Sequence, residues 1–229
     1  MRPAPWKKWL SYLTEFHVED APSELNPALH VCLVNGRYQL CTENAIYSYA
    51  DLYDNFSGAF AQLNLKEQHI KKVLILGFGM ASIPIILEKM GLDYSYTAVE
   101  IDEQVIYLAS KYELPYLRSP VQMICADAAQ WVQISEEQFD LIAVDIFLDD
   151  VIPDRFTQSF FLENTKELLR PEGLLLYNRL ANTATDLEKT RTFFEETFKE
   201  VFPKGRYLEV GGNWMLVSEL INNIPLDRD

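Results

Sequence analysis

The chain has 229 residues, of which 48% are hydrophobic, so it is long enough to form one large domain or one domain with a small appendage. Its net charge of −14 argues against a nucleic acid as the main partner, because binding to phosphates depends on clustered Lys and Arg. An acidic protein instead attracts cations, including amines. Three cysteines and three histidines show no paired spacing, so we expect neither a disulfide framework nor a metal site.

The first residues carry basic side chains but no apolar core of signal-peptide length. Nowhere in the chain do eighteen uncharged apolar residues run together. We therefore expect a soluble, cytoplasmic protein that does not enter a membrane. A short amphipathic helix is expected within residues 5–20, because Trp6, Trp9, Leu10 and Leu13 share one helical face.

A β-hairpin is expected next. Residues 30–34 alternate in polarity, Asn35-Gly36 is a strong two-residue turn, and residues 37–42 return as a strand. Apolar residues then recur at helical spacing through residues 45–65, which predicts a helix. We assign residues 1–66 to an N-terminal unit and residues 67–229 to a nucleotide-binding domain.

The stretch from Lys71 to Asp102 is predicted to form strand, glycine turn, helix and strand. Residues 73–76 are an unbroken apolar run, typical of a strand buried on both faces, and Gly77 and Gly79 allow a tight turn that a ligand can approach. A helix from about residue 81 ends at Gly91. The strand at residues 94–99 ends in Glu100, about twenty residues beyond the glycines, where nucleotide-binding βαβ units carry a ribose-binding carboxylate.

The same alternation of strands and helices continues toward the C-terminus. Strands are predicted at residues 121–125, 139–144 and 174–177, helices at 103–112, 156–169 and 187–198, and a final antiparallel pair at 207–210 and 214–217. This pattern predicts an α/β fold with a mostly parallel sheet, helices on both faces and ligands at the carboxyl ends of the strands. Glu100, Asp127 and Asp145 each follow a strand and should converge there.

Two other interpretations of the glycine turn stay open. A loose G-x-G turn also occurs in sheets that bind nothing. A dinucleotide fingerprint would need a third glycine where Ser82 stands. That departure, together with the antiparallel ending, disfavours an NAD-dependent oxidoreductase.

Five segments in this order resemble the class I S-adenosylmethionine-dependent transferases, and within them the spermidine synthase-like group: VLILGFGMA, VEID, CADA, FDLIAVDIF and LLRPEGLLLYN. The resemblance implies a Rossmann-like class I methyltransferase fold with a seven-stranded sheet. It also implies S-adenosylmethionine or decarboxylated S-adenosylmethionine as the donor. Glu100 would then hold the ribose hydroxyls, Asp127 the adenine amino group, and the turn at Gly77 and Gly79 the donor's tail. Asp145 is the expected catalytic residue, since a carboxylate there can orient an ammonium and accept its proton.

The segment VNGRYQLCTENAIYSYADL resembles the hairpin that precedes the glycine motif in polyamine synthases. This likeness implies that Gln39 faces the active site on the donor side, and that Tyr49 and Asp51 face it on the acceptor side. A homodimer would fit the resemblance, with the N-terminal hairpin as the exposed edge available for pairing.

The chain also departs from the synthase pattern. It has Leu76-Gly77-Phe78-Gly79-Met80-Ala81 in place of G-G-G-D-G-G, and of the D-S-S-D-P motif only Asp145 is retained. Methyl transfer, aminopropyl transfer and a catalytically silent nucleoside-binding domain therefore all stay open.

The loop that should receive the acceptor carries four carboxylates within one stretch of ten residues: Asp145, Asp149, Asp150 and Asp154. A negative field of this kind concentrates cations. It favours a small amine acceptor, with Asp149 among the residues that bind it.

Overall fold

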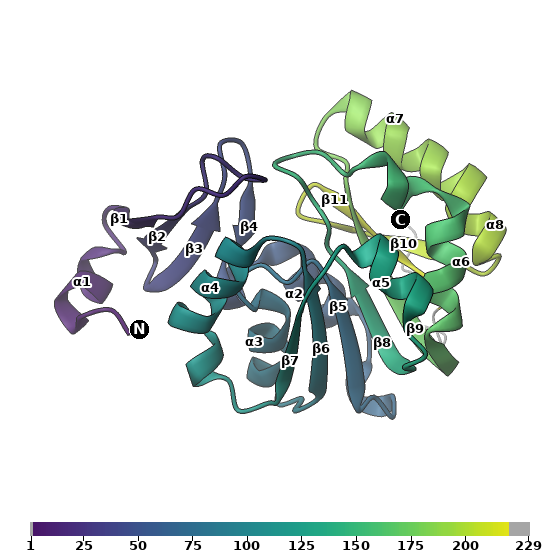
Figure 1. Cartoon of the computed structure of the whole chain (residues 1–229), viewed down its shortest axis with the longest axis horizontal. Helices are drawn as coiled ribbons and strands as arrows, with labels where there is room; N and C mark the ends of the chain where they lie inside the picture. The colour runs from purple at the N-terminus through teal and green to yellow at the C-terminus, as the bar shows by residue number, and fades with distance from the viewer. Residues whose placement is uncertain (1, 220–229) are drawn as a thin grey trace, which may run out of the picture.

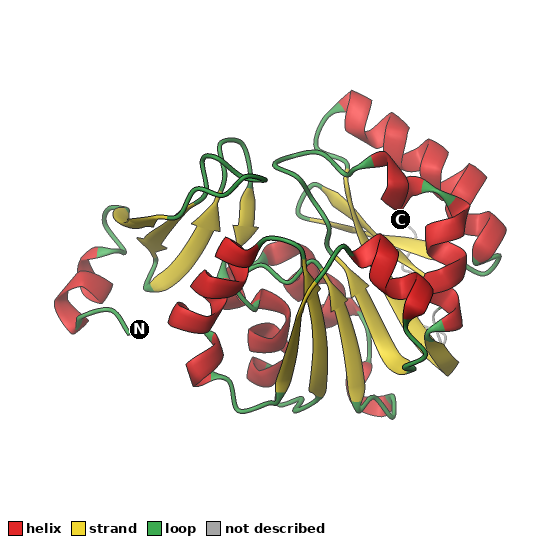
Figure 2. Cartoon of the chain, viewed as in Figure 1, coloured by secondary structure: helices red, strands yellow, loops and turns green. Residues whose placement is uncertain are grey.

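The structure is a computed structural model that describes residues 2–219, and it contains two β-sheets (Figures 1 and 2). A four-stranded antiparallel sheet lies toward the N-terminus, and a seven-stranded sheet with helices on both faces forms the rest. No helix among residues 2–219 is long and apolar enough to cross a membrane.

The N-terminal sheet is built on the predicted hairpin, which is confirmed. β2 (His30–Val34) and β3 (Arg37–Cys41) pair through a turn at Asn35 and Gly36, which both have positive φ. β1 (Phe16–Asp20) and β4 (Ile46–Ser48) complete the sheet in the order β1-β2-β3-β4.

The helix expected within residues 5–20 is shorter than predicted. α1 (Pro5–Leu10) ends because Ser11 turns to the hairpin, where its carbonyl oxygen accepts from the amide of Asn35 and its Oγ from the amide of Gly36, each at 2.8 Å. Residues 16–20 form β1 instead, because they can pair with the open edge of β2. Local helical periodicity is overridden here by strand pairing.

The seven strands of the larger sheet lie in the order β10-β11-β9-β8-β5-β6-β7. Five of them run parallel: β5 (Lys72–Leu76), β6 (Ser95–Glu100), β7 (Val121–Cys125), β8 (Phe139–Val144) and β9 (Leu169–Leu180). β11 (Asn213–Val217) is antiparallel to β9 and to β10 (Arg206–Val210). The predicted α/β fold, with its antiparallel C-terminal hairpin, is confirmed.

Helices cover both faces of this sheet (Figure 1). Val73 and Ile75 pack in one apolar cluster with α2 (Asp54–Gln62) and α3 (Ser82–Lys89), while Leu74 and Leu76 pack in a second cluster on the other face. α4 (Glu103–Tyr112) packs against β6 and β7 and also against the N-terminal sheet. The second face is covered by α5 (Ala128–Ile134), α6 (Ser159–Glu167), α7 (Ala184–Phe193), a π-helical turn (Phe194–Phe198) and α8 (Lys199–Val201). Single 3₁₀ turns lie at Ala50–Leu52, Leu65–Glu67, Leu114–Tyr116 and Asp154–Thr157.

Two predicted helices begin later than their periodicity indicates. The segment at residues 45–65 is divided into β4, a 3₁₀ turn and α2, because Tyr53 has an extended ψ of 90°. The helix predicted at residues 156–169 begins at Ser159, after a 3₁₀ turn. The division of the chain at residues 66 and 67 stays a prediction, although α2 shares the core of the larger sheet.

Candidate active site

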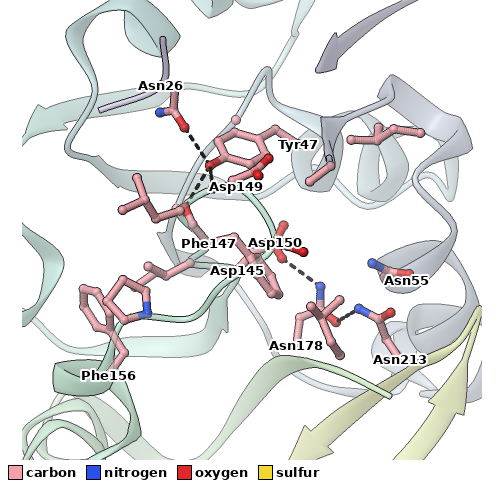
Figure 3. A pocket seen from close by; sticks show the side chains of 18 of the residues that line it. Asn26, Tyr47, Asn55, Asp145, Phe147, Asp149, Asp150, Phe156, Asn178 and Asn213 are labelled. Atoms are coloured by element: carbon pink, nitrogen blue, oxygen red, sulfur yellow. Dashed lines mark hydrogen bonds between the residues drawn. The ribbon is translucent and has the colours of Figure 1, made fainter. Parts of the chain in front are cut away.

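A cavity of about 820 Å³ opens at the carboxyl ends of the parallel strands. Its walls come from the glycine turn after β5, the ends of β6 and β9, and the loop after β8, which we call the acceptor loop (residues 145–153). Residues 44–47 and Tyr49, around β4, and residues 52–55, at the start of α2, also line it. Figure 3 shows that Tyr47, Asn55, Asn178 and side chains of the acceptor loop lie around the same space.

The glycine turn lies directly against the backbone of the acceptor loop. Gly77 has a φ of +85°, and a Cβ there would lie 2.2 Å from the carbonyl oxygen of Asp145, so no other residue fits. Gly79 has a φ of +55° and faces the backbone of Tyr47. Both glycines line the cavity, as the sequence predicted for a turn that a ligand approaches.

Glu100 lies beside this turn and is bonded to it. Its Oε2 accepts from the amides of Phe78 at 3.0 Å and Gly79 at 3.4 Å, and its Oε1 accepts from Ile101 at 2.9 Å and Asp102 at 3.1 Å. Burial raises the pKa of this carboxyl, against the opposing effect of the amides of Asp102, Phe78 and Gly79. Glu100 lines the cavity, but in this structure its carboxylate oxygens are bonded to backbone amides and so stabilise the glycine turn.

Asp145 follows β8 at the floor of the cavity. Its Oδ1 accepts from Nδ2 of Asn178 at 2.9 Å, and the buried Tyr53 hydroxyl also bonds to it. Burial raises the pKa of Asp145 to about 6, and the nearby Glu100 adds to that shift, while the two hydrogen bonds oppose it. A carboxyl with this pKa is mostly ionised at neutral pH yet basic enough to accept a proton, which suits a general base.

Asp127 begins α5 as its N-cap. One oxygen accepts from the amides of Ala129 and Gln130, and the other lies 2.9 Å from a guanidinium nitrogen of Arg155. The residue lines the cavity on the side of β6 and β7, where the sequence placed it. Arg155 is the one cationic side chain among the described residues that line this cavity.

Asp149 fastens the acceptor loop to the N-terminal sheet. Its carboxylate accepts from the Thr42 hydroxyl at 2.5 Å and from the Asn44 amide at 3.0 Å and side chain at 2.5 Å, and these bonds lower its pKa. Tyr47 continues the connection, because its hydroxyl contacts Asn26 and the backbone of the acceptor loop (Figure 3). Asp149, which the sequence predicted to bind substrate, therefore lines the cavity, but both of its carboxylate oxygens already accept hydrogen bonds from Thr42 or Asn44.

The structure brings only part of the predicted N-terminal set to the cavity. Tyr49 lines it, and its hydroxyl accepts from Asn35 at 2.9 Å. Asp51 does not line it, because its carboxylate is bonded to Arg37 and Lys89 and its side chain is only 7% exposed. Gln39 does not line it either, because it is buried within β3.

Acidic side chains dominate the cavity. Seven carboxylates line it, against the single Arg155: Asp54, Glu100, Asp127, Asp145, Asp149, Asp150 and Asp186. Asp154, which the sequence grouped with the loop acids, does not line it. Among residues 2–219 there is no group of three or more His, Cys, Asp or Glu that could hold a metal ion.

Sequence reasoning missed several polar residues of the site. Tyr53, Asn55, Asn178 and Asn213 all line the cavity, and Asn178 and Asn213 are buried. Asn178 ends the segment LLRPEGLLLYN, directly after the apolar strand predicted at residues 174–177, which is the same signal that identified Asp145, although in the structure it lies within β9. The other three carried no comparable signal, because their place depends on how distant segments meet.

Comparison with known proteins agrees with this geometry. Residues 59–224 match the spermine/spermidine synthase domain. A polyamine aminopropyltransferase of Chromobacterium violaceum is 30% identical over 161 residues, covering 70% of this chain and 59% of that protein. One from Vibrio vulnificus is 26% identical over 158 residues, covering 68% of this chain and 52% of that protein. The chain thus spans just over half the length of these relatives.

Solved structures show the same fold. A spermidine synthase in complex with the transition-state analogue AdoDATO has a TM-score of 0.68 at 16% identity, covering 88% of this chain and 72% of that chain. Human methyltransferase-like protein 13 in complex with SAH has a TM-score of 0.58 at 22% identity, covering 76% of this chain and 82% of that chain. Because the spermine/spermidine synthase domain matches residues 59–224, which are more than half of this chain, the chain belongs to the spermine/spermidine synthase family.

Proposed function

We propose that this protein transfers an aminopropyl group from decarboxylated S-adenosylmethionine to a small amine. The observation that carries the proposal is Asp145, a carboxylate with a pKa of about 6 at the floor of a cavity lined by six further acids. The names of its relatives, which are polyamine aminopropyltransferases, favour aminopropyl over methyl transfer.

The residues present fit a nucleoside sulfonium donor. The glycine turn is open to the cavity, Ile101 and Ile146 offer apolar wall, and the surrounding carboxylates complement a positive sulfur. Asp127 would bind the adenine amino group, and Glu100 would bind the ribose. The contact from Gly79 to Glu100, at 3.4 Å, is the longest of the four and the one a ribose hydroxyl can most readily displace.

When bound, such a donor supplies an electrophilic carbon and a neutral thioether as leaving group. Asp145 would accept the proton that the acceptor nitrogen gives up as its lone pair forms the new N–C bond and the C–S electron pair leaves with sulfur. Tyr53 and Asn178 would hold the carboxylate in place during this transfer. Tyr49 and the acids of the acceptor loop would line the path of the amine.

Calorimetric titration tests the donor half of the proposal. Decarboxylated S-adenosylmethionine and methylthioadenosine should bind, and S-adenosylmethionine should bind more weakly, because its carboxylate enters a negatively charged cavity. Tighter binding of S-adenosylmethionine would move the proposal to methyl transfer. Binding by none of the three would favour a catalytically silent member of the family.

A further inference from the structure

Two asparagines continue inward from Asp145 as a chain of hydrogen bonds (Figure 3). Nδ2 of Asn213 donates to Oδ1 of Asn178 at 2.7 Å, and Nδ2 of Asn178 donates to Oδ1 of Asp145 at 2.9 Å. The chain has one direction, because the carboxylate at its end can only accept. The orientation of each amide therefore follows from its neighbour.

The register of β11 on β9 explains why the asparagines meet. Asn213 is paired with Leu180, and side chains two residues apart on a strand share a face, so Asn178 projects on the same side as Leu180. Both asparagines line the cavity on that side. The contact between them is a diagonal cross-strand pair, within reach for long polar side chains.

Burial makes the direction of the chain matter. Asn178 is fully buried and Asn213 is 4% exposed, so water cannot replace a lost partner freely. If the Asn178 amide were reversed, its carbonyl oxygen would face the Asp145 carboxylate, and two acceptors would meet without a proton between them. The Asp145 carboxylate on one side and the donor from Asn213 on the other both favour the observed orientation of Asn178.

We propose that Asn213 is a positioning residue, whose side-chain amide helps to hold Asn178 in the orientation in which its NH₂ group faces the Asp145 carboxylate. This inference rests on the proposed function only in calling Asp145 the base. Its physical content is that Asn213 helps to keep Asp145 ionised through the two hydrogen bonds that join them by way of Asn178. The titratable groups acting on Asp145 among residues 2–219 are Tyr53, ahead of α2, and Glu100, at the end of β6.

The test is a ¹³C NMR titration of the Asp145 carboxyl, assigned by its absence in Asp145→Asn. Asn213→Ala removes the donor, and the titration midpoint of Asp145 should rise by about half a pH unit or more. Asn213→Asp is isosteric but can only accept, so Asn178 should reverse, and the midpoint should rise by more than about one unit. The matched control is Asn182→Asp, which adds the same charge at the cavity wall outside the chain of amides.

The inference stands if Asn213→Ala raises the midpoint above the wild-type value and Asn213→Asp raises it above that of Asn182→Asp. It is overturned if Asn213→Asp shifts the midpoint no further than Asn182→Asp does, or if Asn213→Ala leaves it at the wild-type value. Should Asn213→Ala fail to fold, the comparison of Asn213→Asp with Asn182→Asp decides alone. The midpoint of kcat/KM against pH should move with the NMR midpoint. A wild-type protein without turnover would refute the proposed function while leaving the titration as the test of Asn213.

Discussion

At the scale of single residues, Asp145 combines a cost in stability with a gain in reactivity. Its pKa is raised in the folded protein to about 6 from a usual value of 3.8, so the folded state binds the proton more tightly than the unfolded state does. The stabilising contribution of the protonated carboxyl is complete below pH 3.8 and is lost as the pH rises through about 6. Above that pH the ionised, half-buried carboxylate weakens the fold.

Asp145→Asn should therefore be more stable than the wild type at pH 8, by an amount on the order of 1–3 kcal/mol. The advantage should shrink between pH 6 and 4 and vanish below that range, since the asparagine keeps the shape and can still accept from Asn178. Thermal melts of both proteins across this pH range measure the difference. An advantage that is independent of pH would show that Asp145 does not titrate as described.

Glu100 should matter to nucleoside binding through the turn that it holds. Glu100→Gln replaces one accepting oxygen by a donor facing backbone amides, so the turn should lose its shape, and methylthioadenosine binding should weaken by about 1–3 kcal/mol. Calorimetry on this variant and on Glu103→Gln, an exposed acid in the first turn of α4, provides the comparison. Equal affinities for the two variants would remove Glu100 from the donor site.

At the scale of elements, the acceptor loop and the N-terminal sheet are held together by a few polar contacts. Asp149→Ala removes three hydrogen bonds to Thr42 and Asn44, so residues 145–151 should open more often. Amide hydrogen exchange there should accelerate about tenfold to a hundredfold. Asp150→Ala is the control, because Asp150 is exposed and adjacent in the same loop. Equal exchange in the two variants would mean that Asp149 does not fasten the loop.

Elements whose patterns are local could be predicted from the sequence. The strands that carry Glu100 and Asp145, the glycine turn and the helix at residues 103–112 all have their expected bounds within a residue or two. α5 was not predicted, because it is short and because its N-cap, Asp127, had been interpreted only as a ligand residue. The prediction of a helix within residues 5–20 was wrong for residues 16–20, which form β1. The reason is different: the pairing of β1 with β2 is a tertiary contact that no local sequence pattern shows.

Site residues followed the same division. Acids at strand ends converged as topology requires, whereas Gln39 and Asp51, placed by likeness to the synthase hairpin, lie away from the cavity. Asp51 is held by Arg37 and Lys89, and neither partner could be assigned from spacing. The asparagine chain depends on the register between β9 and β11, which a sequence does not show before the sheet is built.

At the scale of the whole molecule, the distribution of charge matters more than its total. The chain carries −14, yet Asp150 lines the cavity and Asp154, four residues on and also exposed, does not. The charge that acts on an amine acceptor should come from the acids that face the cavity. Asp150 and Asp154 therefore separate the effect of the cavity acids from that of the protein's overall negative charge.

The oligomeric state is a separate property at this scale, and a homodimer stays a prediction.

Asp150→Asn should raise the KM for putrescine or spermidine about twofold to tenfold at low salt, while Asp154→Asn should change it little. The difference should fade as ionic strength rises, because exposed charges are screened over about 8 Å at physiological salt. Steady-state kinetics at two salt concentrations check this. Equal KM values for the two variants would return the loop acids to ordinary solvated surface.

The most direct test of the proposed function is product analysis with decarboxylated S-adenosylmethionine and a panel that includes putrescine and spermidine. Wild-type protein should release methylthioadenosine and an aminopropylated amine in equal amounts, with kcat/KM rising with pH through about 6 as Asp145 ionises. Asp145→Asn should be slower by about a hundredfold to ten-thousandfold, with Asp154→Asn close to wild type. Absence of methylthioadenosine with every amine, or an undiminished rate in Asp145→Asn, would contradict the assignment of this cavity to aminopropyl transfer.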